Sequence, residues 1–307
     1  MNQPRSKKVD VHGWVVLDKD LEQTSTHAVS AVRRLFNAKK GGHAGTLDPL
    51  ATGLLPVALG EATKTVPFVM DGRKTYRFTV TWGSETTTDD TEGEVSQSSD
   101  LRPTREAVEA LLPRYTGTIM QVPPKFSAVK IAGERAYDLA RDGEEVTLEA
   151  RPISVDSLIL TAFSETAGEF EAECGKGTYV RAIARDIGRD LGCFGHVTAL
   201  RRTRVGPFGE DDTVTLEELR ELAEGKIEGQ TIEDALLPVE AALADVPEVR
   251  VNRDTAARLA RGQSAIVRGR DAPVDGTVWV SVAGDPIAIA EVEQGELVPK
   301  RVFVFAA

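Results

Sequence analysis

One acidic side chain stands in a setting that favours chemistry. Asp48 lies in a 13-residue segment, Gly41 to Gly53, that contains four glycines and one proline. Glycine allows the backbone to approach a substrate closely, and Pro49 biases Asp48 to an extended conformation that projects its side chain from the loop. A carboxylate presented in this way can act as a nucleophile or as a base. Taken alone, the same residues are also typical of an Asp-Pro turn in a surface loop.

Residues for several other kinds of site are missing. The segment around Asp48 has no G-x-x-x-x-G-K-[ST] or G-x-G-x-x-G pattern for a phosphate, and no second acid close in sequence for a glycosidase pair. The two cysteines, Cys174 and Cys193, have no C-x-x-C partner and are expected in the core. No metal-ligand spacing is found among the four histidines, which are His12, His27, His43 and His196. We therefore expect neither a metal nor a cofactor.

The elements around Asp48 follow from the hydrophobic pattern. Thr24, Ser25 or Thr26 caps an expected helix that ends near 39–41, and its apolar face is Ala28, Val29, Val32, Leu35 and Phe36. The glycine-rich segment 41–53 is expected to lack regular structure, and 54–59 to be a buried strand. Strict alternation from Thr75 to Trp82 predicts a half-buried strand with Tyr76 on its apolar face.

Later segments alternate between helix and strand signals. We expect an acidic loop at 84–95 and strands at 153–163 and 169–174. Helices are expected after Pro103-Thr104, near 134–141, at 178–191 and from the capping box at 215–218. Thr178 would cap the helix at 178–191 and Gly192 would end it. Beyond residue 235 the sequence pattern changes to short elements separated by glycine and proline. A short helix at 254–261 and strands at 278–282, 287–292 and 302–305 predict a small appended β-barrel.

The distribution of charge along the chain says more about a nucleic acid partner than the total charge does. The chain of 307 residues has 41% hydrophobic residues and a net charge of −11, which suits a globular protein and argues at first against a nucleic acid partner. Residues 1–80, however, hold 12 Lys and Arg against 7 Asp and Glu, whereas residues 210–307 hold 10 against 20. A basic surface near Asp48 is therefore compatible with the acidic total. With no signal peptide and no apolar run of membrane-spanning length, we expect a cytoplasmic protein without membrane contact.

Six segments, in order along the chain, resemble the pseudouridine synthases of the B type, bacterial enzymes that isomerise a uridine in the T loop of tRNA. They are HAGTLDPLATGLLPVALGEATK (43–64), KTYRF (74–78), GSETTTDDTEGEV (83–95), VPPKFSAVKIAGERAYDLAR (122–141), GKGTYVRAIARDIG (175–188) and HVTALRRTRVGPF (196–208). The resemblance implies a central mixed sheet of the α/β (α+β) pseudouridine-synthase fold at residues 1–235. It also implies a clamp for the tRNA T arm at 124–149, a linker at 236–247, and a small RNA-binding β-barrel of the PUA-like kind at 248–307.

The resemblance also implies roles for individual residues. Asp48 matches the catalytic aspartate, which attacks C1′ of the ribose or starts an elimination through C2′, and Arg181 matches the arginine that would keep it ionised. Without the resemblance, Arg181 on the polar face of a helix is a solvated residue and Tyr76 a core residue. The residues implied to bind the uridine or lie near the cleft are His43, Tyr76, Tyr179, Arg181, Leu200 and Lys64. The candidates for phosphate contacts are Lys39, Lys40, Arg201, Arg202 and Arg204.

Two places depart from the family pattern. The segment DKDLEQTS (18–25) lacks the proline and glycine that are common there, which puts the start of the first helix in doubt. Ala44 stands where threonine is common and removes one hydroxyl from the catalytic loop.

The resulting prediction is an isomerase that converts uridine-55 of the T loop to pseudouridine by base flipping. It would act on the tRNA T arm as a monomer, without a cofactor or an obligatory protein partner, and with a possible second activity as a tRNA-folding chaperone. The alternatives are a guide-RNA-dependent relative that acts on ribosomal RNA and a non-catalytic tRNA chaperone. A glycosidase-like hydrolase is disfavoured because Asp48 has no acidic partner nearby in sequence.

Overall fold

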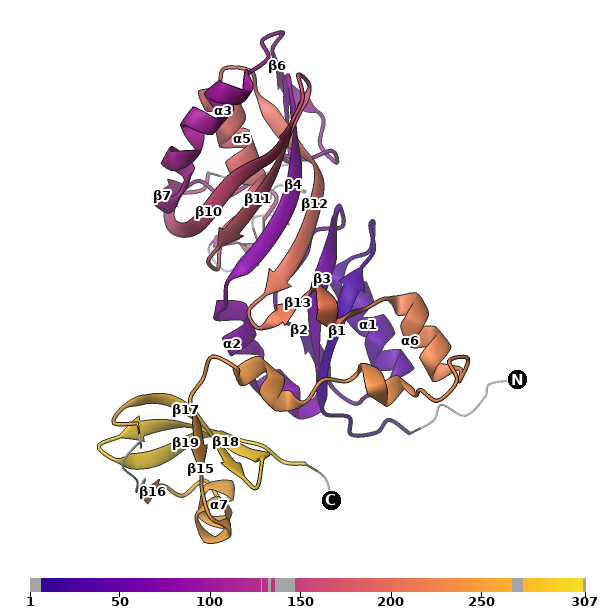
Figure 1. The fold of residues 1–307 in the computed structure, drawn as a ribbon, viewed down its shortest axis with the longest axis vertical. Coiled ribbons are helices and arrows are strands. Elements are labelled where there is room, and N and C mark those ends of the chain that lie inside the picture. The colour runs from indigo at the N-terminus through magenta and orange to yellow at the C-terminus, as the bar shows by residue number, and fades with distance from the viewer. Residues whose placement is uncertain (1–6, 128, 132–133, 136–146, 267–272, 306–307) are drawn as a thin grey trace.

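Two sheets dominate the structure (Figure 1). The computed structural model describes residues 7–127, 129–131, 134–135, 147–266 and 273–305. The first sheet has 10 strands of mixed direction and the second, near the C-terminus, has 5 and is curled into a half-barrel. This arrangement confirms the predicted fold class.

The large sheet lies above the C-terminal sheet in the view of Figure 1 and extends through the rest of the molecule. Its strands are β1 (Gly13–Lys19), β2 (Gly41–His43), β3 (Ala51–Leu59), β4 (Lys74–Trp82), β7 (Gly117–Gln121), β10 (Arg151–Phe163), β11 (Ala167–Cys174), β12 (Gly195–Val205), β13 (Phe208–Gly209) and β14 (Thr213–Val214). The spatial order is β14-β1-β3-β12-β4-β11-β10-β7, with β2 paired to β3 and β13 to β12. Neighbours are antiparallel except for the pairs β1–β14 and β3–β12.

Helices cover this sheet at two places. They are α1 (Ser25–Leu35), α2 (Val66–Asp71), α3 (Arg105–Leu111), α5 (Val180–Asp190) and α6 (Leu216–Ala223), with 3-10 turns η1 (Gly60–Lys64), η2 (Leu112–Tyr115), η3 (Glu210–Asp212), η4 (Ile232–Ala235) and η5 (Val239–Leu243). Helix α1 packs against β2, β3 and α6, and α5 packs against β4 and β12. The threonine caps are as predicted: Thr24, Thr104 and Thr215 each accept a backbone N–H of the helix that follows.

The site region forms where β3 meets β12. Only three residue pairs join these parallel strands, and the last is Arg202 with Gly53. Gly53 has a φ of +95°, and a Cβ on it would lie 2.2 Å from the carbonyl oxygen of Arg202. A glycine is therefore required for the two backbones to approach this closely.

The C-terminal sheet has its own core. It consists of β15 (Glu248–Arg250), β16 (Ala265–Ile266), β17 (Gly276–Val282), β18 (Asp285–Glu293) and β19 (Glu296–Val302), in the order β15-β17-β18-β19-β16, and helix α7 (Arg253–Ala260) packs on it. The residue after β19, Phe303, packs with Val239 and Leu243 of the segment 236–247, in a cluster that also contains Trp14 of β1. Lys64 Nζ donates to the Val302 carbonyl at 2.7 Å, and Val304 N donates to Glu61 at 2.8 Å.

Several element predictions are wrong in detail. The segment 41–53 is not wholly irregular, because 41–43 pair with β3 as a short strand and 51–53 begin β3 itself. The expected acidic loop at 84–95 begins with a strand, since β5 (Ser84–Thr86) pairs with β6 (Val95–Ser98). Thr178 does not cap α5: Tyr179 is the N-cap residue, and the Thr178 hydroxyl donates to Ser154 O instead.

Two further predictions differ from the structure. The last strand is 296–302 rather than 302–305, because Leu297 and Val298 pair with β18 and leave 303–305 to contact the main body. Residues 134–135 pair as strand β9 (Glu134–Arg135) with β8 (Lys130–Ile131), not as a helix, and the remainder of the expected helix at 134–141 lies outside the described residues. Both cysteines are buried in the core, as predicted.

Among the helices of the described residues, none combines the length and the apolar character that crossing a membrane requires.

The close approach at Gly53 generates a test of stability. We expect Gly53→Ala to lower the free energy of unfolding by at least about 2 kcal/mol, because its Cβ meets backbone and its φ is unfavourable for alanine. Gly42→Ala is the matched control, since a Cβ there meets nothing within 4 Å. Urea unfolding followed by circular dichroism measures both, and equal effects of the two substitutions would contradict the reasoning.

Candidate active site

Asp48 lies in the loop between β2 and β3, and its neighbours in sequence are anchored. The Ser25 hydroxyl accepts from Leu47 N and donates to Leu47 O, both at 2.9 Å. The buried Lys19 donates from Nζ to Pro49 O at 3.4 Å and to two carbonyls of the 20–23 turn. The altered 18–25 segment therefore still caps α1 and supports the loop. These contacts hold the Asp48 carboxylate on a fixed backbone.

Arg181, near the start of α5, is the ion-pair partner of Asp48. Its Nη2 lies 2.9 Å from Asp48 Oδ2, so the pairing predicted from the sequence is present. The Arg181 side chain is 6% exposed, whereas that of Asp48 is 38% exposed. The carboxylate therefore remains open to a ligand on one side while a buried cation orients it from the other.

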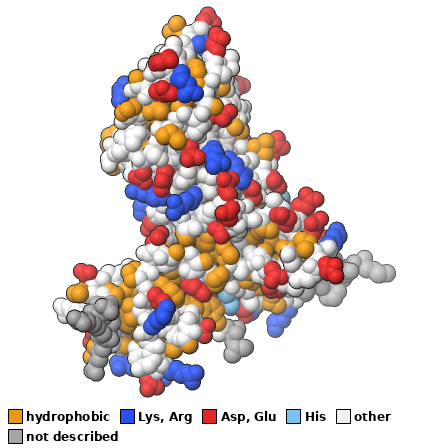
Figure 2. All heavy atoms as spheres, in the orientation of Figure 1, with side chains coloured by type: hydrophobic (Ala, Val, Ile, Leu, Met, Phe, Trp, Pro, Cys, Tyr) orange, Lys and Arg blue, Asp and Glu red, His pale blue; other side chains and the backbone are white. Residues whose placement is uncertain are grey.

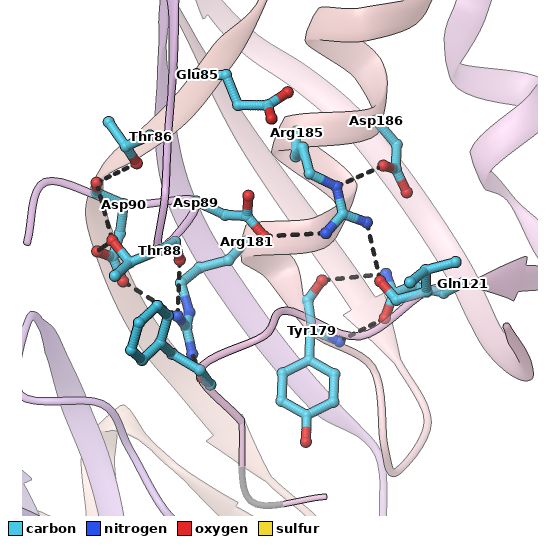
Figure 3. A network of polar contacts seen from close by, with 12 residues as sticks. Glu85, Thr86, Thr88, Asp89, Asp90, Gln121, Tyr179, Arg181, Arg185 and Asp186 are labelled. Atoms are coloured by element: carbon cyan, nitrogen blue, oxygen red, sulfur yellow. Dashed lines mark hydrogen bonds and ion pairs between the residues drawn. The ribbon is translucent and has the colours of Figure 1, made fainter. Parts of the chain in front are cut away.

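The same guanidinium binds three further groups (Figure 3). Nη1 donates to Thr88 O at 2.8 Å and lies 3.3 Å from Asp90 Oδ2, and Nη2 also donates to Phe126 O at 2.9 Å. Asp90 is almost fully buried, and its Oδ1 accepts from the Thr88 hydroxyl and from Glu92 N. A planar guanidinium held by contacts in several directions has little freedom to rotate. Arg181 is thus a fixed reference point for Asp48.

Arg181 is the first of three arginines spaced four residues apart on α5, which places them on one helix face. Arg185 Nη1 contacts Asp89 at 3.0 Å, and its Nη2 donates to Val122 O at 2.9 Å. Arg189 binds Glu85 with two contacts of 2.6 and 2.7 Å. Every arginine of this column pairs with an acid of the 85–90 segment, and Figure 3 shows the pairs made by Arg181 and Arg185. The column joins α5 to the loop that supplies Asp90.

A cavity of about 310 Å³ opens beside the ion pair. The predicted residues Tyr76, Tyr179, Arg181 and Leu200 line it together with Asp48. Backbone contacts hold Tyr179 in place, because its N–H donates to the Gln121 side chain at 2.9 Å and its carbonyl accepts from the same amide at 3.1 Å. The remaining lining residues of interest are Gly45, Thr46, Met70, Lys74, Lys176 and Arg202.

Tyr76 and Arg202 lie against each other in the wall of this cavity. Burial raises the pKa of the Tyr76 phenol, and the neighbouring Arg202 guanidinium opposes that shift. Burial lowers the pKa of Arg202, while Tyr76 and Asp48 oppose the change. The phenol therefore remains protonated at neutral pH and presents a flat ring to the cavity.

His43 lines a second cavity, of about 480 Å³, on the other side of the ion pair. Asp48 and Arg181 line both cavities, so the pair lies between them. Burial, followed by the charge of Arg202, lowers the pKa of His43, which favours the neutral ring. Asp90 and Glu92 also line this second cavity. The sequence argument that Asp48 has no acidic neighbour therefore holds only along the chain, because the fold brings Asp90 to the same arginine.

Some predicted residues lie elsewhere. Lys64 lines neither cavity: it pairs with Glu61 and donates to Val302 O where the C-terminal sheet meets the body. Arg202 is 2% exposed and is therefore unavailable for the predicted phosphate contact on the surface. Arg201 is held by Asp18 and Glu210, and Lys39 by Asp10.

Most of the residues that support the Asp48–Arg181 pair were not predicted from the sequence. Asp89, Asp90, Arg185 and Arg189 were not predicted, although the four-residue spacing of the arginines and the Asp-Asp pair are visible in the sequence. Their pairing across about 90 positions becomes apparent only in the fold. Site roles for Lys19, Ser25 and Lys74 were also not predicted, although Lys74 begins the KTYRF segment and Lys19 and Ser25 lie in DKDLEQTS.

The arrangement supports a reaction at a carbon or proton next to Asp48. One carboxylate oxygen is held by Arg181, and the cavity beside it is bounded by an aromatic ring and by Leu200, which suits a flat, partly apolar group. Among the described residues, no three His, Cys, Asp or Glu side chains are placed to hold a metal ion. The site offers nucleophilic or base catalysis by Asp48.

Comparison with known proteins gives matches along nearly the whole chain. Residues 33–180 match the sequence model of the TruB family pseudouridylate synthase N-terminal domain, and residues 181–244 match the tRNA pseudouridylate synthase B C-terminal domain. A Bradyrhizobium diazoefficiens protein named tRNA pseudouridine synthase B is 62% identical over 98% of this chain and 88% of its own length. A Sinorhizobium medicae protein of the same name is 56% identical over 99% of both chains.

A solved structure confirms the fold. A chain of the archaeal box H/ACA sRNP Nop10-Cbf5 complex matches with a TM-score of 0.73 at 24% identity, covering 98% of this chain and 89% of that one.

The buried Asp89 generates a prediction of pH dependence. Burial raises the pKa of its carboxyl to about 6, and Arg185 and Arg181 only partly oppose this shift. The folded protein thus keeps a proton that the unfolded chain releases near its ordinary pKa of 3.8, so this group's contribution to stability is lost as pH rises through about 6. We expect the free energy of unfolding of the wild type to fall relative to Asp89→Asn between about pH 4 and pH 7, by at most about 3 kcal/mol. Urea unfolding at several pH values measures this, and a difference that is constant with pH would contradict it.

Proposed function

The chain belongs to the TruB family of pseudouridylate synthases, and from this premise we propose that it converts uridine-55 in the T loop of tRNA to pseudouridine. It is an isomerase that acts on tRNA. The observation that supports the proposed chemistry best is the Asp48 carboxylate, paired with the buried Arg181 and open to a cavity. It would act in the cytoplasm, where its substrate is.

Asp48 is the proposed catalytic residue. In one route its carboxylate attacks C1′ of the ribose, so that a C1′–O bond forms as the C1′–N1 bond breaks. In the other it removes the C2′ proton, and a C1′–C2′ double bond forms as the base leaves. In both routes the electron pair of the broken bond stays on the base. The base then turns and C5 joins C1′. In the first route the C1′–O bond to Asp48 breaks as this bond forms, and in the second Asp48 returns the proton to C2′. C5 then loses its proton and N1 gains one, so that substrate and product are isomers.

The cavity walls would hold the base during this rearrangement. The ring of Tyr76 is placed to stack on the uracil, and Tyr179 and Leu200 close the pocket around it. A volume of about 310 Å³ accommodates one nucleoside with room to turn. These contacts use the flat faces of the base, so they remain favourable while its edge rotates.

The target uridine must leave the stack of the T loop before Asp48 can reach it, at a cost of a few kcal/mol. His43, in the second cavity beside the ion pair, is placed to contact the extruded nucleotide or to fill the position that it leaves. We do not assign a substrate contact to Lys64, because it binds the C-terminal segment.

We propose the domain assignment with the function. Residues 1–235 form the catalytic domain, 236–247 the linker and 248–307 the RNA-binding domain. The segment 124–149 is the proposed clamp for the T arm. Support for the clamp comes from its base, where the Phe126 and Val122 carbonyls accept from Arg181 and Arg185. A T arm held there would lie beside the cavity.

The Asp48–Arg181 pair and the cavity beside it are formed by residues of a single chain. We therefore propose that it acts as a monomer and needs neither a guide RNA nor a second protein. Formation of pseudouridine on a bare T-arm stem-loop by the purified chain would exclude the guide-dependent alternative. Free uracil among the products would instead indicate a hydrolase.

The first prediction concerns Asp48 itself. Asp48→Asn keeps the size of the side chain and removes the nucleophile or base, so we expect pseudouridine formation to fall by at least about 10⁴-fold. The dissociation constant for the T-arm RNA should change by less than about threefold, because the RNA backbone contacts remain. Single-turnover assays with mapping of the modified nucleotide, together with filter binding, measure the two effects.

The exposed Asp211→Asn serves as the control for Asp48→Asn and should retain full activity. Normal turnover by Asp48→Asn would disprove the mechanism. If Asp48→Asn still rescued the folding of misfolded tRNA, a separate chaperone activity would coexist with catalysis.

The second prediction concerns salt. Figure 2 shows Lys and Arg groups in a band across the middle of the large sheet, among acids, while acids gather over α6. We expect affinity for the T-arm RNA to fall at least about tenfold between about 50 and 200 mM salt. Lys and Arg side chains that contact phosphates displace the counterions condensed on the RNA, and this displacement becomes less favourable as the salt concentration rises. Lys40→Gln, at an exposed residue of the basic N-terminal part, should reduce the slope by about one. Lys226→Gln, in the acidic part and paired with Glu224, should not. Affinity that is independent of salt would contradict the prediction of a basic RNA-binding surface near Asp48.

A further inference from the structure

Two buried cations, Lys74 and Arg202, line the same cavity as Asp48. Lys74 is 7% exposed and Arg202 is 2% exposed. They come from neighbouring strands, β4 and β12. Their positive charges are close enough that Arg202 contributes to lowering the pKa of Lys74. The wall of the cavity therefore contains two adjacent positive charges in a poorly hydrated place.

Neither cation has a carboxylate partner within the described part of the chain. Arg202 donates to the carbonyls of Leu54, Gly45 and Thr46 at 2.8, 3.0 and 3.4 Å. Lys74 donates to the carbonyls of Met70 and Gly72. These acceptors are neutral. The three arginines of α5, by contrast, each contact an acid.

Burying a charge without a counterion is unfavourable, and burying two side by side is more so. Burial, reinforced by Arg202, lowers the pKa of Lys74 to about 8. Carbonyl dipoles offset part of the cost but leave two net charges. Groups perturbed in this way are characteristic of functional sites, because a ligand of opposite charge removes the penalty.

The reaction itself generates a suitable anion. Uridine enters the cavity uncharged. When the C1′–N1 bond breaks, its electron pair remains on N1, and the negative charge spreads over N1, O2 and O4 of the base. Attack by Asp48 at C1′ and removal of the C2′ proton by Asp48 both transfer its negative charge to the base. The uracil anion is therefore common to the two routes.

We propose that Lys74 and Arg202 form a subsite that stabilises the uracil anion after the glycosidic bond breaks. The inference rests on the proposed function. The stabilisation increases as the bond breaks, because the neutral base gains its charge only then, so it accelerates the chemical step rather than substrate binding. It also retains the free base while it turns. When C5 of the anion bonds to C1′, the negative charge returns to Asp48 and the base becomes neutral, so the attraction to the two cations weakens. The subsequent loss of the C5 proton and protonation of N1 leave this charge unchanged.

The proposed role of the Lys74 charge in bond cleavage can be tested by changing the leaving group. One T-arm RNA carries uridine at the target position and another carries 5-fluorouridine, whose base is the better leaving group because fluorine stabilises its anion. The measurement is the single-turnover rate at which the target N1–C1′ bond is lost, followed in nuclease digests. Lys74→Met removes the charge, and Lys74→Arg is the matched control that keeps it.

We expect Lys74→Met to slow cleavage of uridine by about 10- to 100-fold and of 5-fluorouridine by less than about fivefold. Lys74→Arg should restore both rates to within about threefold of the wild type. The ratio of the two rates within one variant does not depend on how much of the protein is folded. Equal slowing of the two substrates by Lys74→Met would overturn the proposal.

A phosphate of the RNA is the competing occupant of this subsite. In that case Lys74→Met would weaken RNA binding, reduce the salt slope by about one and leave the cleavage rate unchanged, which would also overturn the proposal. Failure of the proposed function is a separate result, because the wild-type protein would then form no pseudouridine on the RNA that carries uridine.

The pH profile gives a second readout. With a pKa of about 8, Lys74 loses its proton as pH rises through that value, so the wild-type cleavage rate should fall above about pH 8. Lys74→Arg should not show this fall. The charged and titratable groups that face Lys74 are Arg202, Cys174, Asp71 and Lys176, and burial raises the pKa of the Cys174 thiol to about 11, so it stays neutral over this range. A fall of the same size in Lys74→Arg would contradict the assignment.

Discussion

The guanidinium of Arg181 is the contact on which the rest of the site depends. It joins the Asp48 carboxylate, the buried Asp90 and the carbonyls of Thr88 and Phe126, which belong to three separate segments of the chain. The Asp48 side chain is 38% exposed and that of Asp90 is 1% exposed, so one cation holds both the acid that we propose to react and a buried structural acid. Helix α5, which carries Arg181, fixes the position of the guanidinium. A shift of the helix, the 85–90 loop or the 122–126 segment would therefore move the charge that orients Asp48.

The positive charges around the cavity fall into two kinds. The arginine column of α5 is neutralised by acids and holds the fold together. Lys74 and Arg202 donate to carbonyls and form no ion pair within the described residues, so their charges remain available to whatever occupies the cavity. This difference also explains how an acidic protein with a net charge of −11 serves an RNA substrate. Local placement of charge within about 10 Å matters more than the total, because salt screens longer distances.

Much of the fold was predictable from local patterns. Threonine caps defined the starts of helices at Thr24, Thr104 and Thr215, and alternation defined the strand that carries Tyr76. Local rules failed where tertiary contacts compete with them. Residues 41–43 form a strand because β3 offers partners for their backbone groups, and 303–305 lie outside the last strand and pack on the main body. The hydroxyl of Thr178 bonds across the sheet instead of capping α5.

The sequence by itself determined which residue we propose to react. The glycine-rich loop, the proline after Asp48 and the six ordered segments that resemble a known family identified the acid, its arginine and three walls of the cavity, because these features are encoded in short motifs. Only the tertiary structure decided what supports them. Asp90 reaches Arg181 across about 90 positions, Lys64 binds the C-terminal segment, and Arg202 is buried beneath Tyr76 instead of on the surface. The physical reason is that charge pairing and burial depend on distance in space, and a sequence does not contain those distances.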